Sequence, residues 1–171
     1  MLTGRWMKIA ESTLTGTAST VTFNVGKFKE YLIYMWAAPS ADVSMQMTIN
    51  GVTDSVYTVQ EGLGTGTGTA SATKNTNAYH EVSANAVDGA SSVGALFSSI
   101  NVLKPASGTM GYIVQDSAYM DTSADPQLMV AGTEFNKTDQ NISSFEFKLN
   151  TTGNYAVGSR WIIYCKNAAG L

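Results

Sequence analysis

The fold of this chain is decided by segments such as VSMQMTING, residues 43–51, in which apolar and polar side chains alternate until the chain reaches Asn50-Gly51. Alternation with a period of two puts successive side chains on opposite faces of an extended strand. Asn and Gly both tolerate positive φ, so the pair at the end of an alternating strand predicts a tight hairpin turn. The segment therefore predicts a β-strand with one buried face, followed by a turn into a second strand.

The same alternation recurs almost from one end of the chain to the other. Residues 21–25 and 145–149 show it clearly, and Pro39 and Pro105 each close an apolar run because proline cannot donate to a sheet. No segment has the periodicity of a helix. We expect strands over residues 6–14, 19–25, 30–38, 42–50, 55–59, 93–103, 111–119, 127–135, 142–149 and 160–166.

The length and composition predict one all-β domain over residues 1–171. A chain of 171 residues can bury roughly 70% of the surface that its unfolded form exposes. Its hydrophobic fraction of 44% is typical of a folded protein. Roughly eight or more antiparallel strands in one domain form a sandwich, a jelly roll or a barrel. The variable spacing favours a jelly-roll-like antiparallel β-sandwich, and a barrel is the alternative.

One segment departs from the strand pattern. Residues 62–73, GLGTGTGTASAT, place glycine at alternating positions and offer almost nothing to bury. A loop of this length is uncommon in a compact domain and is usually functional or disordered. Because ordering it costs about 1–2 kcal/mol per residue, we expect residues 62–78 to form a long Gly/Thr-rich insertion loop held by contacts with a partner. The candidate subunit or capsid contacts are Met1, Leu2, Trp6, Gly62, Leu63, Gly64, Thr65, Gly66, Thr67, Gly68 and Lys74.

Charge and hydropathy exclude several classes of partner. The net charge is -3, and the ten Lys and Arg residues are scattered, whereas nucleic-acid binding usually needs a basic stripe. The longest apolar run, residues 31–38, is far shorter than the ~20 residues of a membrane-spanning helix. The N-terminus lacks the pattern of a secretory signal, and the single Cys165 excludes an internal disulfide. We therefore expect no nucleic acid, no membrane, and assembly in a reducing cytoplasm.

The usual materials of an active site are scarce. His80 stands beside Glu81 and is a candidate general base, but no serine or cysteine can be placed next to it, so a structural histidine is the favoured interpretation. Cys165 lies in an apolar strand, where a free cysteine behaves as a small hydrophobic residue. The sequence predicts no enzyme and no cofactor.

Three carboxylates raise the question of a cation. Asp116, Asp121 and Asp125 gather around residues 119–120, and convergent carboxylates bind calcium. Their spacing does not match an EF-hand loop, and a polar turn before Pro126 explains them better. Whether they bind a cation stays open.

The order of the segments resembles a known family. WMKIAE at residues 6–11, FKEYLIY at 28–34, MTINGVTD at 47–54 and YAVGSRWIIY at 155–164 are similar to a diffuse family of tailed-bacteriophage virion proteins. In that family an opening tryptophan strand, a Tyr-x-x-Leu-like strand, an Asn-Gly hairpin and a closing Gly-Ser-x-x-x-x-Tyr strand surround a jelly-roll-like β-sandwich. The stretch between Glu61 and Val93 has no counterpart in this pattern, so the resemblance implies no function for it.

The resemblance implies a virion structural protein. Members resemble capsid decoration proteins, head fibres and tail modules. We expect a decoration, or cement, protein made in the host cytoplasm that binds the major capsid protein on the outside of the assembled head, as a homotrimer, and stabilises contacts between capsomers. Trp36 and Trp161 are expected to be interface or core anchors.

The alternative is a tail or head-fibre module that binds host surface glycans. Trp6, Trp36 and Trp161, with several tyrosines, would then form an exposed aromatic platform.

Overall fold

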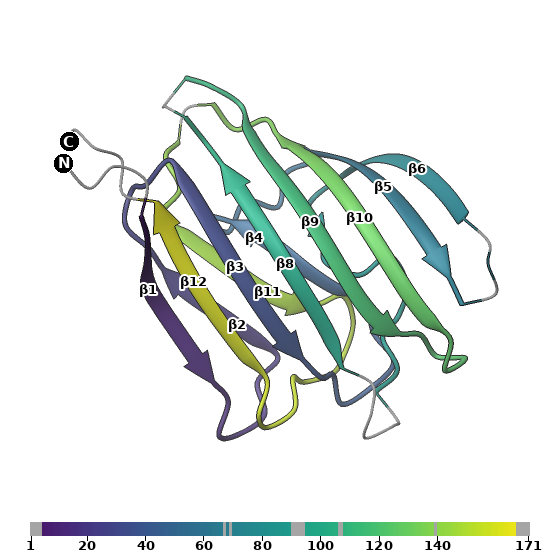
Figure 1. Ribbon diagram of the computed structural model, residues 1–171. Coiled ribbons are helices and arrows are strands. Elements are labelled where there is room, and N and C mark those ends of the chain that lie inside the picture. The colour runs from purple at the N-terminus through teal and green to yellow at the C-terminus, as the bar shows by residue number, and fades with distance from the viewer. Residues whose placement is uncertain are drawn as a thin grey trace.

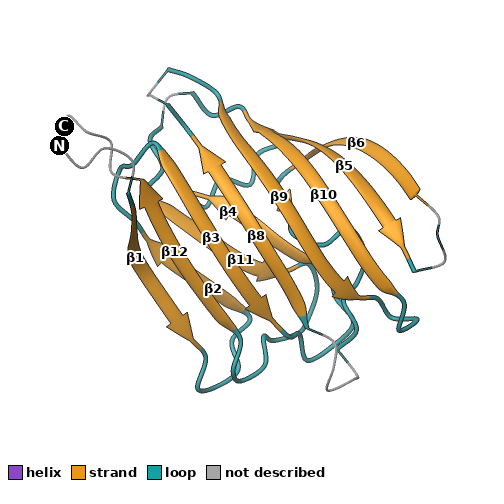
Figure 2. Cartoon of the chain, viewed as in Figure 1, coloured by secondary structure: helices purple, strands orange, loops and turns teal. Residues whose placement is uncertain are grey.

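The computed structural model of the chain describes residues 5–66, 68, 70–89, 95–105, 108–138 and 140–166. In this part of the chain twelve strands and no helix form two antiparallel sheets that pack against each other (Figures 1 and 2). The large sheet has the order β1 (Trp6–Thr13), β12 (Arg160–Lys166), β3 (Glu30–Ala37), β8 (Leu96–Leu103), β9 (Gly111–Met120), β10 (Pro126–Phe135), β5 (Tyr57–Thr65), β6 (Ala70–Asn77). The small sheet has the order β2 (Thr20–Asn24), β11 (Ser144–Leu149), β4 (Met45–Ile49), β7 (His80–Glu81). The expected all-β antiparallel sandwich is confirmed.

Four strand pairs are nested within one another. β1 pairs with β12, β2 with β11, β3 with β8 and β4 with β7, as if one long hairpin had been rolled up. Two further hairpins lie outside this nesting: β5–β6 is inserted between β4 and β7, and β9–β10 between β8 and β11. Both join the large sheet, which therefore extends beyond the small one (Figure 1).

The core lies between the two sheets and is rich in aromatic rings. Trp161 is fully buried, and its ring meets Tyr155 edge-on with centroids 5.0 Å apart. Phe147 and Phe23 lie at 6.1 and 6.5 Å from it. Such pairs stabilise the core beyond the area that they bury. Trp161 is therefore a core residue.

Most strands start and end close to where alternation predicts them. The exceptions are β4, which begins at Met45 and not at residue 42, and β5, which runs on to Thr65. The two-residue strand β7 was not expected at all. Residues 93 and 94, the first of an expected strand, lie outside the described residues.

The prediction of a loop over residues 62–78 is wrong. Residues 62–65 belong to β5, which pairs along its length with β10, and residues 70–77 form β6, which pairs with β5. The backbone is therefore held by hydrogen bonds within the chain, without need of a partner. Alternation missed this hairpin because its outer end buries little: every residue of β6 except Asn77 is exposed.

The hairpin predicted at Asn50-Gly51 is wrong as well, although the turn itself exists. Both residues have positive φ, 56° and 65°, and the Val52 amide donates to the Ile49 carbonyl at 3.0 Å. The next strand, however, joins the other sheet. The Asn50 side chain accepts hydrogen bonds from the amides of residues 143 and 144, so it fastens the loop before β11.

Candidate functional site

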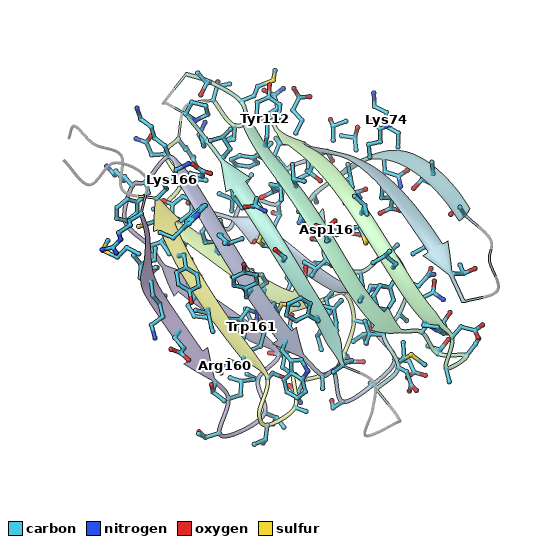
Figure 3. The ribbon with its side chains drawn as sticks, viewed as in Figure 1. Lys74, Tyr112, Asp116, Arg160, Trp161 and Lys166 are labelled. Carbon is cyan, nitrogen blue, oxygen red and sulfur yellow. The ribbon has the colours of Figure 1, made fainter. Side chains whose placement is uncertain are left out.

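The side of the large sheet that faces away from the small sheet, here called the outer face, is not covered by any other described element (Figure 1). Along β9 the side chains alternate strictly: Ile113 and Gln115 are buried, whereas Tyr112, Val114 and Asp116 are exposed on the outer face. Figure 3 looks onto this face, with Tyr112 and Lys74 toward one end, Arg160 toward the other and Asp116 between them.

One end of the outer face carries an apolar shelf. Trp36 on β3 lies opposite Phe97 on β8, and both side chains are about half exposed. With Tyr34, Ile162 and Arg160 they line a shallow cavity of 190 Å³. Large exposed apolar side chains that lie together on one surface commonly mark an interaction site.

The charged side chains of β1, β12 and β3, the strands that form one half of the outer face, make ion pairs with one another. Glu11 on β1 accepts hydrogen bonds from Lys8 at 2.7 Å and from Arg160. The hydrogen bonds from Lys8 and Arg160 hold the pKa of the Glu11 carboxyl below its usual range, and Glu11 in turn raises the pKa of Lys8. Lys166 pairs with Glu30 at 3.1 Å. Exposed pairs such as these contribute little stability, but each of these charged groups already has a partner of opposite sign.

The other half of the outer face carries charges that form no ion pair in the described part of the chain. Asp116 lies at the centre of the sheet, beside the exposed Val114 and opposite Val130. Glu134 and Lys74 lie further along, beside a hollow of 310 Å³. This half is therefore able to offer charges to a ligand or partner.

A network of buried polar side chains lies on the inner side of β9 and β10, opposite the outer face. His80 is fully buried; its Nε2 lies 2.6 Å from Oε1 of Gln115 and its Nδ1 lies 2.8 Å from Oγ1 of Thr133. The Gln115 amide donates to the Val82 carbonyl and to the Ser117 hydroxyl. A neutral imidazole satisfies both partners, with Nε2 donating and Nδ1 accepting. Burial lowers the pKa of His80 to about 4.

His80 and Glu81 are adjacent in the sequence, which suggested His80 as a general base, but their side chains do not form an acid–base pair. Neighbouring residues on a strand point to opposite faces. His80 lies opposite the buried Met47, whereas Glu81 lies opposite Gln46. His80 is therefore a structural residue that joins β7 to the large sheet.

Glu81 instead meets Glu61 of β5, across the gap between the two sheets. Asn77 donates to Oε1 of Glu81 at 2.7 Å and Thr73 donates to Oε1 of Glu61 at 2.8 Å. The Oε2 of Glu61 is buried and has no hydrogen-bond donor, unless the neighbouring carboxyl keeps its proton. Burial and the charge of Glu61 raise the pKa of Glu81 to about 7. At mildly acidic pH Glu81 therefore keeps its proton.

The three aspartates of the possible cation site do not converge. Oδ1 of Asp121 accepts from the backbone amides of Ser123 and Asp125 at 2.9 and 3.0 Å, and its Oδ2 accepts from the Gln127 amide at 2.8 Å. Asp121 therefore stabilises the turn between β9 and β10, while Asp116 lies on the outer face of β9. Among the described residues no group of three metal-ligating side chains is present.

Cys165 is buried in the core of the large sheet, and burial raises the pKa of its thiol. A thiol becomes reactive when its pKa is lowered, so this environment is that of a structural cysteine.

The residues predicted to contact a partner are spread over two edges of the large sheet. Trp6 lies on the edge strand β1, exposed, with the Lys166 ammonium 5.9 Å from its ring centroid. Gly62, Leu63, Gly64 and Thr65 lie in β5, Gly66 and Gly68 in the turn that follows, and Lys74 in the edge strand β6. Met1, Leu2 and Thr67 lie outside the described residues.

No protein-family model, curated protein or solved structure matches this chain. The described residues form no helix that could cross a membrane.

Proposed function

We propose that this chain is a decoration, or cement, protein of a tailed bacteriophage, which binds the major capsid protein on the outside of the assembled head. The observation that supports this proposal is the apolar outer face, where Trp36, Phe97, Leu128 and Val130 remain about half exposed. A monomer gains nothing by leaving such side chains in water, whereas a binding partner would bury them.

The strand arrangement is in keeping with the resemblance to virion proteins. Nested pairing of β1 with β12, β2 with β11, β3 with β8 and β4 with β7 is what a jelly-roll-like sandwich requires. We propose that the two inserted hairpins widen one of its sheets to form the contact surface.

The mechanism would be mass action. A ligand that binds only the assembled shell stabilises it by RT ln(1 + [L]/Kd) for each site. Many copies of modest affinity then strengthen contacts between capsomers. The proposed homotrimer would add avidity, because three linked sites act together. A monomer at micromolar concentration in light scattering would contradict the trimer.

The test has two parts. The copy number in purified virions, measured by quantitative mass spectrometry against the major capsid protein, should be in the hundreds. Binding of the purified chain to undecorated shells should be weakened at least tenfold by Phe97→Ser with Leu128→Ser, and left unchanged by Thr22→Ser on the small sheet. A handful of copies, or equal binding by the variants, would contradict the proposal.

A second candidate function, binding of host surface glycans by a tail or head-fibre module, is favoured by the hollow beside Lys74 and Glu134, where an exposed tyrosine ring lies next to hydrogen-bonding side chains. The three tryptophans do not form a platform together, because Trp161 is buried. The exposed Trp6 and Trp36 lie on β1 and β3, which β12 separates. A glycan array distinguishes the two functions, since a capsid-binding protein needs no saccharide.

A further inference from the structure

The hollow on the outer face is formed where one strand position has no side chain. Gly132 of β10 lies at its floor, between Val114 on β9 and Gln60 on β5. Lys74 stands opposite Gln60 on β6, and Tyr112 of β9 forms another wall. The lining therefore comes from four neighbouring strands at the end of the large sheet marked by Tyr112 and Lys74 in Figure 3.

The fold gives no steric reason for a glycine at position 132. A Cβ built there would meet no atom within 4 Å, and the residue is not in the left-handed region. Glycine weakens the interior of a strand, because it has the most conformational freedom to lose and no side chain to pack. The hollow is therefore a feature that folding does not require, kept open at some cost to the strand.

The side chains around the hollow combine one aromatic ring with several hydrogen-bonding groups. Tyr112 is 49% exposed, so a broad part of its ring is open to a ligand. Gln60 supplies an amide and Thr58 a hydroxyl, while Lys74 and Glu134 bring opposite charges and take part in no ion pair among the described residues. An amphipathic ring with a few convergent polar groups is typical of a ligand site.

The charges and the polarity of the side chains that line the hollow indicate which chemical class of ligand it can bind. One ammonium faced by one carboxylate does not favour an anion such as a phosphate, which binds to clustered cations. The hollow is open, and its lining sets the apolar side chains of Tyr112 and Val114 beside hydrogen-bonding groups, so a ligand needs both an apolar face and polar groups. A neutral polyhydroxylated ring fits both requirements, because its apolar face packs on tyrosine and its hydroxyls bond to amide, ammonium and carboxylate groups.

We propose that the hollow above Gly132 binds one neutral sugar residue of a glycan, with Tyr112 against the apolar face of the pyranose and Gln60, Lys74 and Glu134 as hydrogen-bond partners of its hydroxyls. This site rests on the second candidate function, glycan binding, and is independent of capsid binding.

The experiment is a titration of the full chain, followed by its amide chemical shifts, with the methyl glycosides of glucose, galactose, mannose and N-acetylglucosamine. At least one glycoside should shift the amides of Gln60, Val114 and Gly132 in a saturable way. Gly132→Leu fills the hollow, and Tyr112→Ala removes its ring; each should weaken binding at least tenfold. Both positions are exposed, so the fold should survive. Trp36→Ala, on the apolar shelf, is the matched control and should bind as the unchanged chain does.

The outcomes separate the site from the function. If a glycan array is positive and Trp36→Ala abolishes binding while Gly132→Leu does not, glycan binding stands and the hollow is wrong. If neither the array nor the titration shows binding, both are overturned. Binding that Gly132→Leu and Tyr112→Ala abolish, and Trp36→Ala spares, supports the site.

Discussion

Acidification should destabilise this protein through His80, the one histidine in the sequence. Its ring is fully buried between the sheets and, when neutral, satisfies Gln115 and Thr133. Burial lowers the pKa of His80 from the ordinary 6.5 to about 4, and the hydrogen bond to Gln115 offsets only part of that effect. The unfolded chain therefore binds a proton at a pH where the folded chain does not.

The size of the effect follows from linkage. For a group whose pKa is depressed by folding, the stability is present above the unfolded pKa of 6.5 and is lost as the pH falls toward the folded pKa of about 4. Each pH unit within that window changes the free energy of unfolding by about 1.4 kcal/mol. Between pH 6.5 and about pH 5 the contribution of His80 is therefore a loss of about 2 kcal/mol.

The titration of Glu81 partly offsets the loss of unfolding free energy that His80 causes on acidification. Its pKa is raised from 4.5 to about 7, so its contribution is present below pH 4.5 and is lost as the pH rises toward 7. In the pH range where both groups titrate, acidification lowers the stability through His80 and raises it through Glu81. Because Glu81 is only half buried and solvent screens its interactions, the cancellation is incomplete, and the unchanged chain should lose less than about 2 kcal/mol on acidification.

Glu81→Gln should expose the full effect of His80. Glutamine keeps the acceptor for Asn77 and offers a permanent donor to Glu61. Urea unfolding at several pH values should show the free energy of unfolding of the variant falling by about 2 kcal/mol between pH 6.5 and 5, more steeply than that of the unchanged chain.

Two results would refute the reasoning. One is an identical pH dependence in Glu81→Gln and the unchanged chain. The other comes from the single histidine signal in NMR: a ring that titrates near pH 6.5 in the folded protein would mean that His80 is not buried as a neutral group.

Three further predictions concern packing. Trp161→Ala should lower the free energy of unfolding by about 3–5 kcal/mol in urea, because it leaves a cavity in the aromatic core, and a loss below about 1 kcal/mol would contradict its burial. Gly89→Ala should lower the melting temperature, since its Cβ would lie 2.4 Å from the Ala41 backbone, whereas Gly132→Ala, in open space, should leave it unchanged or raise it; equal effects of the two would be inconsistent with the structure. Cys165 should not react with a thiol reagent until the chain unfolds, and stoichiometric reaction of the folded protein would show that it is accessible.

Alternation predicts strands only where one face is buried and the other is not. β9 and β10 alternate strictly between buried and exposed residues, and both were expected almost residue for residue. β6 has two exposed faces, so no pattern of hydrophobicity marks it, and the glycines of β5 read as a loop. The turn at Asn50-Gly51 was readable from local chemistry, but the sheet that receives the next strand depends on packing over the whole chain.

The candidate sites could not be predicted from the sequence either, because they also depend on how the strands are ordered in the sheets. Tyr112, Gly132 and Gln60 stand on three strands whose order in the sheet no local pattern reveals. Glu61 and Glu81 lie in different sheets and meet only because β5 and β7 pass close to each other. The surface role of Trp36 could have been suspected from its own strand, since it occupies the same face as Tyr34 and Glu30 and the opposite face from the buried Met35.

The two inserted hairpins explain why this chain carries a broad surface at all. The nested pairs account for the aromatic core around Trp161, which needs neither β5–β6 nor β9–β10. The hairpins instead carry the exposed Val130, the hollow above Gly132 and Asp116, which forms no ion pair with any residue that the structure describes. Their inward side chains also bury apolar surface, as the rings of Tyr57 and Phe135 do with centroids 5.1 Å apart. Burial and backbone pairing therefore both offset the cost of the hairpins in chain entropy. A surface held in this way can vary its outward side chains without disturbing the core, which is where a binding function on this fold would be placed.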